Sequence, residues 1–202
     1  IGKSAMTANT TGGHNTAVGF YAAGANTTGD YNVAVGRQAF DANTTGSYNT
    51  AIGVAALGSN TTADNNVAVG YAAGGLITTG ANNTLVGQQA GDALTTGDLN
   101  VAIGKDALGG NAVGDRNVAI GGSALSSYAP STNEDGYNVA IGLNSMISTT
   151  TGTTNTAVGG LSLGANTTGN GNVALGYIAL EANTTGATNT AVGQEALQKN
   201  TT

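Results

Sequence analysis

The sequence predicts an all-β protein, a parallel β-solenoid of about twelve 17-residue coils. Three observations support this fold class: a short phrase returns at a regular interval, the phrase is rich in β-branched residues, and Asn-Thr-Thr-Gly turns separate its copies. The chain has 202 residues, of which only 8% are charged and 40% are hydrophobic, a composition that argues against disorder. We therefore interpret residues 1–202 as a single repeat domain.

Each copy of the phrase, Asn-Val-Ala-Val-Gly or a close variant, begins with an asparagine. Nine of the ten intervals between the eleven asparagines are 17 residues long. The interval from Asn117 to Asn138 is 21 residues long. The anchoring residues are Asn15, Asn32, Asn49, Asn66, Asn83, Asn100, Asn117, Asn138, Asn155, Asn172 and Asn189. Stacked Asn amides can both donate and accept hydrogen bonds, so we expect these side chains to form a structural ladder along the solenoid.

A unit of this length is too short for a pair of helices, and it fits one coil made of two strands and two bends. Val, Ile and Thr favour the strands, and the Gly at the end of each phrase marks a bend. Coils that hydrogen-bond to each other at a rise of ~4.8 Å would build a rod roughly 55 Å long.

The alternation within the phrase places its valines on one side of a strand and its Asn, Ala and Gly on the other. We expect the aliphatic side to fill the coil interior, with Val35, Ile52, Val69 and Val86 stacked as one buried file. The uniform Asn, Ala and Gly of the other side indicate that something packs closely against it. Either another chain or a folded-back part of the same coil could do so.

A second Asn opens the turn phrase, and Ile77 and Leu94 replace it in two copies, so we expect this slot to be partly buried there. The Asn-x-Thr motifs are also sequons for N-glycosylation, which requires an exposed loop and a suitable host. The candidate glycosylation sites are Asn9, Asn26, Asn43, Asn60, Asn82, Asn166, Asn183 and Asn200. A repeat rich in Asn and Thr also produces such motifs without selection for glycans.

One stretch, within residues 126–137, breaks the rhythm. It holds the four extra residues and the only Pro of the chain. We expect a loop that protrudes from one coil, in which Tyr128, Pro130, Glu134 and Asp135 are candidate contact residues. A cation held by Glu134 and Asp135 is an alternative interpretation of the same stretch.

The consensus NTAVGxxALxxNTTGxYN resembles the repeats of tail-fibre-domain proteins of phages and environmental bacteria. More distantly, the phrase NVAIG is similar to the head repeats of trimeric autotransporter adhesins of the YadA type. The resemblance covers nearly the whole chain, and it implies a left-handed parallel β-roll in an extracellular or virion fibre, usually a homotrimer. The adhesin repeat is shorter than the present one, and neither its membrane anchor nor the chaperone domain of phage fibres is seen here. Trimerisation and anchoring are therefore implied by the resemblance alone.

Residues suited to catalysis are sparse. The chain has no Cys and a single histidine, His14, and Ser123 lies in a GGSAL context that is not a nucleophile elbow. Five dispersed basic residues and a net charge of −6 argue against nucleic acid, and no apolar run is long enough to span a membrane. We expect no catalytic, metal or cofactor site. The sequence favours a non-catalytic structural fibre or filament, adhesive or appendage-forming, located outside the cell or on a virion.

Two other functions remain open at this point. An ice-binding solenoid is one, because Thr-Thr pairs recur along the turns and one residue of each pair would face outward. A phage tail fibre that binds surface glycans is the other, although the seven Tyr form no continuous stripe. As its partner we expect another copy of the chain, in a homotrimer or in a head-to-tail filament. The chain begins three residues into a copy and stops within a turn phrase, so we expect a segment of a longer fibre or a stacking subunit.

Overall fold

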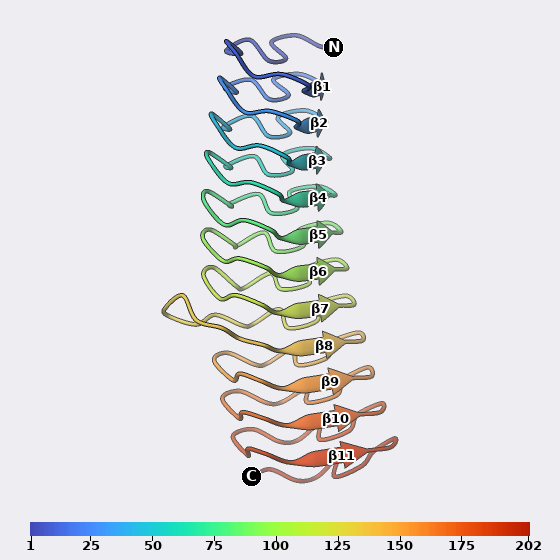
Figure 1. Ribbon diagram of the computed structural model, residues 1–202. Helices are drawn as coiled ribbons and strands as arrows, with labels where there is room; N and C mark the ends of the chain where they lie inside the picture. The colour runs from blue at the N-terminus through green and yellow to red at the C-terminus, as the bar shows by residue number, and fades with distance from the viewer.

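The computed structural model describes residues 1–202 and is a parallel β-solenoid without a helix (Figure 1). Its eleven strands pair in parallel, in chain order, and form one sheet. The strands are β1 (Thr16–Val18), β2 (Val33–Val35), β3 (Thr50–Ile52), β4 (Val67–Val69), β5 (Thr84–Val86), β6 (Val101–Ile103), β7 (Val118–Ile120), β8 (Val139–Ile141), β9 (Thr156–Val158), β10 (Val173–Leu175) and β11 (Thr190–Val192). Each coil thus contributes one strand, and we number the coils by their strands.

The predicted second strand of each coil is wrong. Its place is taken by consecutive turns, in which the amide of Ala56 bonds to the carbonyl of Gly53 and that of Gly58 to the carbonyl of Ala55. Ala55 and Leu57 have φ values of 56° and 47°, in the left-handed region that non-glycine residues seldom adopt. Only 20 of the 131 backbone hydrogen bonds lie within the strands, and many others join a turn to the same turn of the next coil. The coils are therefore held together mainly through their turns.

The glycine that ends each strand is required by its surroundings. Gly53, for example, has a φ of 137°, and a Cβ atom there would lie 2.3 Å from the carbonyl oxygen of Gly70 in the next coil. No side chain fits in that gap, which explains why this slot of the repeat is always Gly.

The two sides of each strand face the opposite way from the prediction. Ala51, at the centre of β3, is fully buried, whereas Ile52 is 39% exposed on the outside. The expected buried file of Val35, Ile52, Val69 and Val86 lies on the outer face of the sheet. The coil is thin, and its interior already holds asparagines and a leucine from the turns, so only a methyl group fits behind most strands. The Asn and Ala side packs against the folded-back part of its own coil.

The anchoring asparagines form the expected ladder inside the solenoid. In coil 4, Nδ2 of Asn66 donates to the carbonyl of Gly80 at 2.8 Å, and Oδ1 accepts from the backbone amide of Asn83 at 2.9 Å. Nδ2 of Asn83 donates to the same Oδ1 at 3.1 Å. Each amide thus ties a strand to a turn of its own coil and to the next coil, which fixes the register of both.

The turn asparagines form a second, shorter ladder. Nδ2 of Asn43 donates to Oδ1 of Asn26 at 2.7 Å and to the carbonyl of Gly46 at 3.0 Å. This ladder stops at coils 4 and 5, where Ile77 and Leu94 occupy its place and are fully buried, as the sequence indicated.

The irregular residues of coils 4 and 5 form one packing cluster. A Cβ atom at Gly74 would lie 2.6 Å from Cδ1 of Leu85 and 3.1 Å from Cδ1 of Ile77. A Cβ atom at Gly91 would lie 2.8 Å from Cδ2 of Leu85 and 2.9 Å from Cδ1 of Leu94. The two glycines stand where most coils have Leu, Phe or Met, and their missing side chains make room for the three larger ones.

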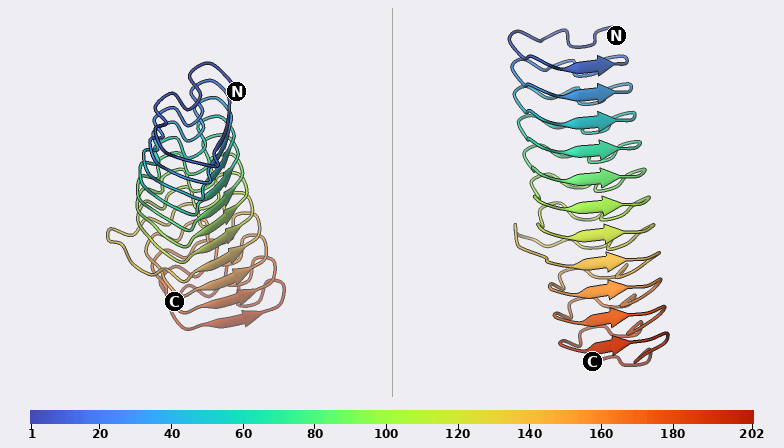
Figure 2. Two further views of the ribbon diagram at one scale, coloured as in Figure 1. Left: turned by 45° about the horizontal axis from the view of Figure 1, so that its top comes forward. Right: turned by 45° about the vertical axis from the view of Figure 1, so that its right-hand side comes forward.

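The four extra residues form a loop that projects from the rod between β7 and β8 (Figure 2). The ladder continues past this loop, because Nδ2 of Asn138 still donates to Oδ1 of Asn117 at 3.2 Å. The insertion therefore leaves the stacking of the neighbouring coils in place.

Candidate functional site

The outer face of the sheet is a continuous surface that runs along the rod. Each strand presents two outward side chains, and all of them are Val, Ile, Leu or Thr, without one charged residue. Val18, Ile52, Ile103 and Leu175 are 38, 39, 38 and 37% exposed, and Val192 on the terminal strand β11 is 68% exposed. The face is therefore uncharged and partly exposed along the whole rod.

An aromatic stack follows one edge of this face. His14 and Tyr31 stack with ring centroids 4.7 Å apart, and Tyr31 and Tyr48 stack at 5.1 Å. Further along the same slot, the guanidinium of Arg116 lies 5.9 Å from the ring centroid of Tyr137. The stack ends after three coils, since the next residue of the slot is Asn65.

The second threonine of each Thr-Thr pair is exposed, and the first is engaged with the backbone. Oγ1 of Thr27 donates to the carbonyl of Thr44 at 2.8 Å, and Oγ1 of Thr44 donates to that of Thr61 at 3.0 Å. Thr28 and Thr45 point into solvent. One hydroxyl file faces out, as predicted, and Val113 interrupts it.

Most sequon asparagines lie inside the solenoid. Asn26, Asn43, Asn60, Asn166 and Asn183 are at most 1% exposed. A glycan could be attached to these residues only before the coil closes. Asn9 and Asn200 are half-buried in the terminal coils, whereas Asn82 is exposed, with a φ of 59°.

The candidate contact residues in the loop have different environments. Tyr128 occupies the interior slot of a turn asparagine and is fully buried, and its hydroxyl has no hydrogen-bond partner. Burial, reinforced by the negative charges of Glu134 and Asp115, raises the pKa of Tyr128 to about 12. Pro130 packs beside Tyr128, over Gly114. Tyr128 and Pro130 therefore anchor the loop instead of offering it for contact.

The two acidic residues of the loop are exposed, but they are not equivalent. Asp135 forms an ion pair with Arg116, whereas Glu134 has no ion-pair partner. The backbone of the loop closes on the preceding coil, where the amide of Asp115 donates to the carbonyl of Glu134 at 3.0 Å. The structure contains no group of three or more His, Cys, Asp or Glu that could hold a metal ion, so no further ligand joins Glu134.

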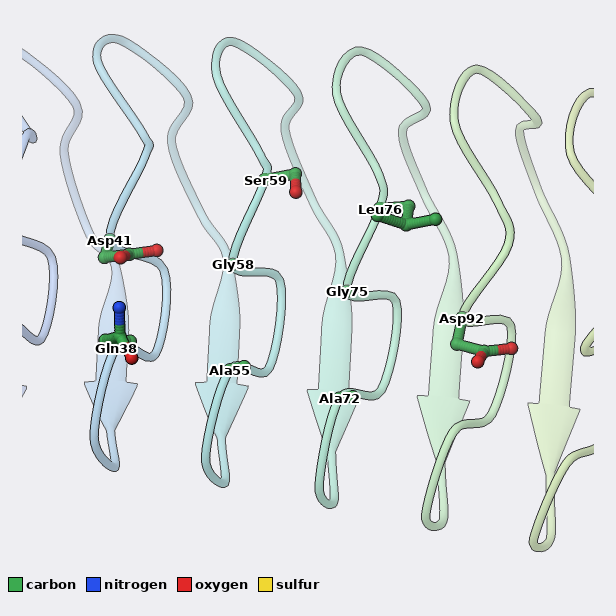
Figure 3. A pocket seen from close by; sticks show the side chains of 9 residues that line it. All are labelled: Gln38, Asp41, Ala55, Gly58, Ser59, Ala72, Gly75, Leu76 and Asp92. Atoms are coloured by element: carbon green, nitrogen blue, oxygen red, sulfur yellow. The ribbon is translucent and has the colours of Figure 1, made fainter.

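A shallow depression of about 360 Å³ crosses coils 2 to 5 on another side of the rod (Figure 3). Its lining comprises Gln38, Asp41, Ala55, Gly58, Ser59, Ala72, Gly75, Leu76 and Asp92. Burial raises the pKa of the Asp41 carboxyl, and hydrogen bonds from Gln38 and the backbone oppose that rise. Gln89 donates to Asp92 at 3.2 Å, so a Gln–Asp pair stands at either end.

Sequence reasoning missed this depression, although the signal was present. Coils 3 and 4 have Ala and Gly at the positions where coils 2 and 5 have Gln and Asp. Small residues in two neighbouring coils, between larger residues on both sides, leave a hollow in the surface. The slot becomes visible only when the coils are aligned by their turns.

None of the residues forms a helix that is long and apolar enough to cross a bilayer. Comparison with protein-family models, curated protein sequences and solved structures found no match to the chain.

Proposed function

We propose that this chain is a non-catalytic structural segment of an extracellular fibre, part of a cell-surface appendage or of a virion. The observation that carries the proposal is the uninterrupted rod, in which eleven coils stack in one register. Each coil is bonded to both neighbours by backbone and by buried amide ladders, so a bend would have to break several bonds at once. A stiff spacer of constant cross-section is what a fibre requires.

The residue composition supports the same function. The side chains able to act as nucleophile or base are few and scattered: His14 stacks on an aromatic neighbour, and Ser123 is a half-buried turn residue with a φ of 53°. An active site needs several polar side chains that converge on one point. In this chain the buried polar side chains are mainly asparagines that form hydrogen bonds between coils.

The proposal is tested by labelling the organism or virion that makes the protein. Antibodies against the folded chain, bound to gold particles, should decorate thin filaments outside the cell or on the virion in electron micrographs. Label confined to the cell interior, with no filament, would contradict the proposal. Pre-absorption of the antibody with the purified chain is the control.

Glycan recognition is a second candidate, favoured by the depression of Figure 3. Its two carboxylates and its Ser59 hydroxyl lie around small residues that include Ala55 and Ala72, and such polar groups can bond to sugar hydroxyls. Binding of the purified chain to a glycan array, lost in Asp41→Ala and retained in Asp64→Ala on a different slot of the repeat, would support it. An array without signal would remove it.

A further inference from the structure

The outer face of the sheet lacks a partner within the chain. Its length follows from eleven strands at ~4.8 Å, which gives roughly 53 Å, and its width from three residues at ~3.3 Å, which gives about 10 Å. Two such faces in contact would bury about 1,000 Å² in projection, which reaches the lower bound for a specific protein interface before side-chain relief is added. Uncharged aliphatic patches of this size mark association sites on soluble proteins.

We infer that this face binds the same face of a second copy of the chain, in a two-fold pair whose rods run antiparallel. The inference deepens the proposed fibre function and rests on it for its biological role. A partner that covers the full face must present contacts at the same spacing, because the face repeats at every coil. A second copy supplies that spacing along its whole length, and both faces consist of Val, Ile, Leu and Thr without a charged residue.

The alternation of Thr and Val selects the antiparallel arrangement. The first outward residue of the strands reads Thr16, Val33, Thr50, Val67, Thr84, Val101, Val118, Val139, Thr156, Val173 and Thr190, and the alternation breaks only around Val118. A two-fold axis along β6 would place Thr16 opposite Thr190 of the second copy and Thr50 opposite Thr156. Hydroxyls would then meet hydroxyls in these pairs and could bond to each other, whereas Thr84 would lie opposite Val118.

A parallel pair satisfies these hydroxyls less well. Its two-fold axis would run along the rod. The first outward residues of the strands in one copy would then lie against the second outward residues of the strands in the other copy. Thr50 would then lie against Ile52, and its hydroxyl would be covered by an aliphatic side chain without a partner. Burial of an unbonded hydroxyl is unfavourable, so the antiparallel pair is preferred.

The centre of the face carries its largest continuous aliphatic area. Strands β6, β7 and β8 all present Val followed by Ile, with no Thr among their outward residues. In the antiparallel pair this region lies next to the two-fold axis, where contacts are most completely shielded from water. Interfaces concentrate their binding energy in such central residues.

The oligomeric state is measured by sedimentation equilibrium of the 202-residue chain over a wide range of concentrations. We expect a dimer, and we expect Ile103→Lys, which places two like charges beside the axis, to be monomeric at concentrations where the parent is paired. The matched control Thr96→Lys adds the same charge on an exposed turn and should remain dimeric. Equal far-ultraviolet circular dichroism of all three proteins shows that the fold is retained.

The orientation is measured with spin labels, which the absence of natural Cys makes simple. In an antiparallel pair, labels at Thr28→Cys are separated along the rod by about eight coil spacings, roughly 40 Å, whereas labels at Thr96→Cys lie at nearly the same height. The Thr28 distance should therefore be clearly longer than the Thr96 distance. Equal distances would indicate parallel rods and overturn the inference.

Other outcomes also decide the question. A monomer at every concentration, a trimer, or a dimer insensitive to Ile103→Lys would each overturn the pair. A monomer that shows thermal hysteresis would assign the face to ice. Gold-labelled filaments together with a monomeric purified chain would refute this inference alone, whereas a dimer found only inside cells would refute the fibre function alone.

Discussion

Coils 2 and 5 have the same backbone but opposite interiors. Coil 2 contains Phe40 and the turn asparagine Asn43, while coil 5 contains Leu85, Gly91 and Leu94. Both interiors contain the anchoring asparagine. The first adds one large apolar side chain and the amide bonds of a turn asparagine, and the second adds apolar contacts in place of the turn asparagine. The comparison shows that the interior of each coil is filled by side chains, but that different positions of the repeat can provide them.

The comparison also explains why one asparagine slot tolerates replacement and the other does not. In coil 2 the carbonyl of Gly46 accepts from Asn43 at 3.0 Å and from the anchoring Asn32 at 2.8 Å. In coil 5 the carbonyl of Gly97 accepts from the anchoring Asn83 alone, at 2.9 Å. Loss of the turn asparagine therefore leaves no carbonyl without a donor. Loss of an anchoring asparagine would also remove the acceptor of a backbone amide in the next coil, as Oδ1 of Asn83 is for Asn100.

The largest effect is expected from the anchoring ladder. Asn49→Ala leaves the buried amide of Asn66 without its acceptor and removes three bonds donated by Nδ2, so we expect a loss of about 3 kcal/mol in the free energy of unfolding. Asn60→Ala, in the turn slot of the same coil, should cost about half as much. Urea denaturation followed by circular dichroism measures both, and equal losses would contradict the distinction between the slots.

The aliphatic interior should depend most on Leu85, which lies against both Gly74 and Gly91. Leu85→Ala removes the group that occupies the space of two missing side chains, and large-to-small changes in cores cost about 2–5 kcal/mol, so we expect a loss of about 3 kcal/mol. Val86→Ala, the outward neighbour, is the control and should cost under about 1 kcal/mol. A loss at Leu85 no greater than that of the control would show that the cluster is loosely packed.

The aliphatic interior should be transferable to coil 2 only as a set. Asn43→Ile alone removes the amide bonds and has no room beside Phe40, so it should destabilise the chain. Combination with Phe40→Gly places the same pair of residues in coil 2 as Gly74 and Ile77 in coil 4, without the leucine beside them, and should recover about 1 kcal/mol relative to the sum of the single changes. A double-mutant cycle in urea measures this coupling. A sum that is simply additive would mean that the two slots fill their space independently.

A charge on the outer face should matter less than any of these interior changes. Val69→Asp lies on the outer face of β4, where its carboxylate is hydrated in the single chain, and at concentrations where the chain is monomeric we expect a loss of about 1 kcal/mol from strand preference. The buried position inferred from the sequence would require a far larger loss. Thermal unfolding of Val69→Asp beside Val69→Thr distinguishes the two placements.

The smallest effect concerns Asp41, on the outside of coil 2. Its folded-state pKa is raised by burial, so the folded chain holds this proton more tightly than the unfolded chain does. The stability of the parent should therefore fall as the pH rises from the ordinary carboxyl pKa through the raised one, and remain lower above it. Asp41→Asn should lack this component, and a difference between the two proteins that does not vary with pH would contradict it.

The sequence reveals the period and the ladder because each repeats in register; it predicts about twelve coils, and the structure has eleven strands. It does not reveal which side of the strand is inside, since Asn-Val-Ala-Val-Gly has two faces of equal regularity. The deciding fact is the thickness of the coil: Ala51 fits behind the strand and Ile52 does not. One available hint was the exchange of Thr for Val in the first outward file, which an exposed position tolerates.

The turns and the depression were less accessible from the sequence. Ala55 and Leu57 are ordinary residues, and nothing in their identity indicates a left-handed conformation, which is imposed by bonds to the coils on either side. The depression combines three slots of the repeat over four successive coils, and it becomes recognisable only when these coils are aligned by their turns, which brings Gln38, Asp41 and Asp92 to one surface.

The coil-by-coil bonding has a mechanical consequence. Tension applied to the two ends of the chain would load the terminal coil first, because every inner coil is bonded on both sides. Detachment of one coil frees a full repeat of chain, which extends to about 60 Å at ~3.5 Å per residue but occupied only ~4.8 Å of the rod. A pulled rod would therefore lengthen in equal steps, one for each coil that detaches. Each step relieves the tension, so the force on the chain would stay limited under a sudden load.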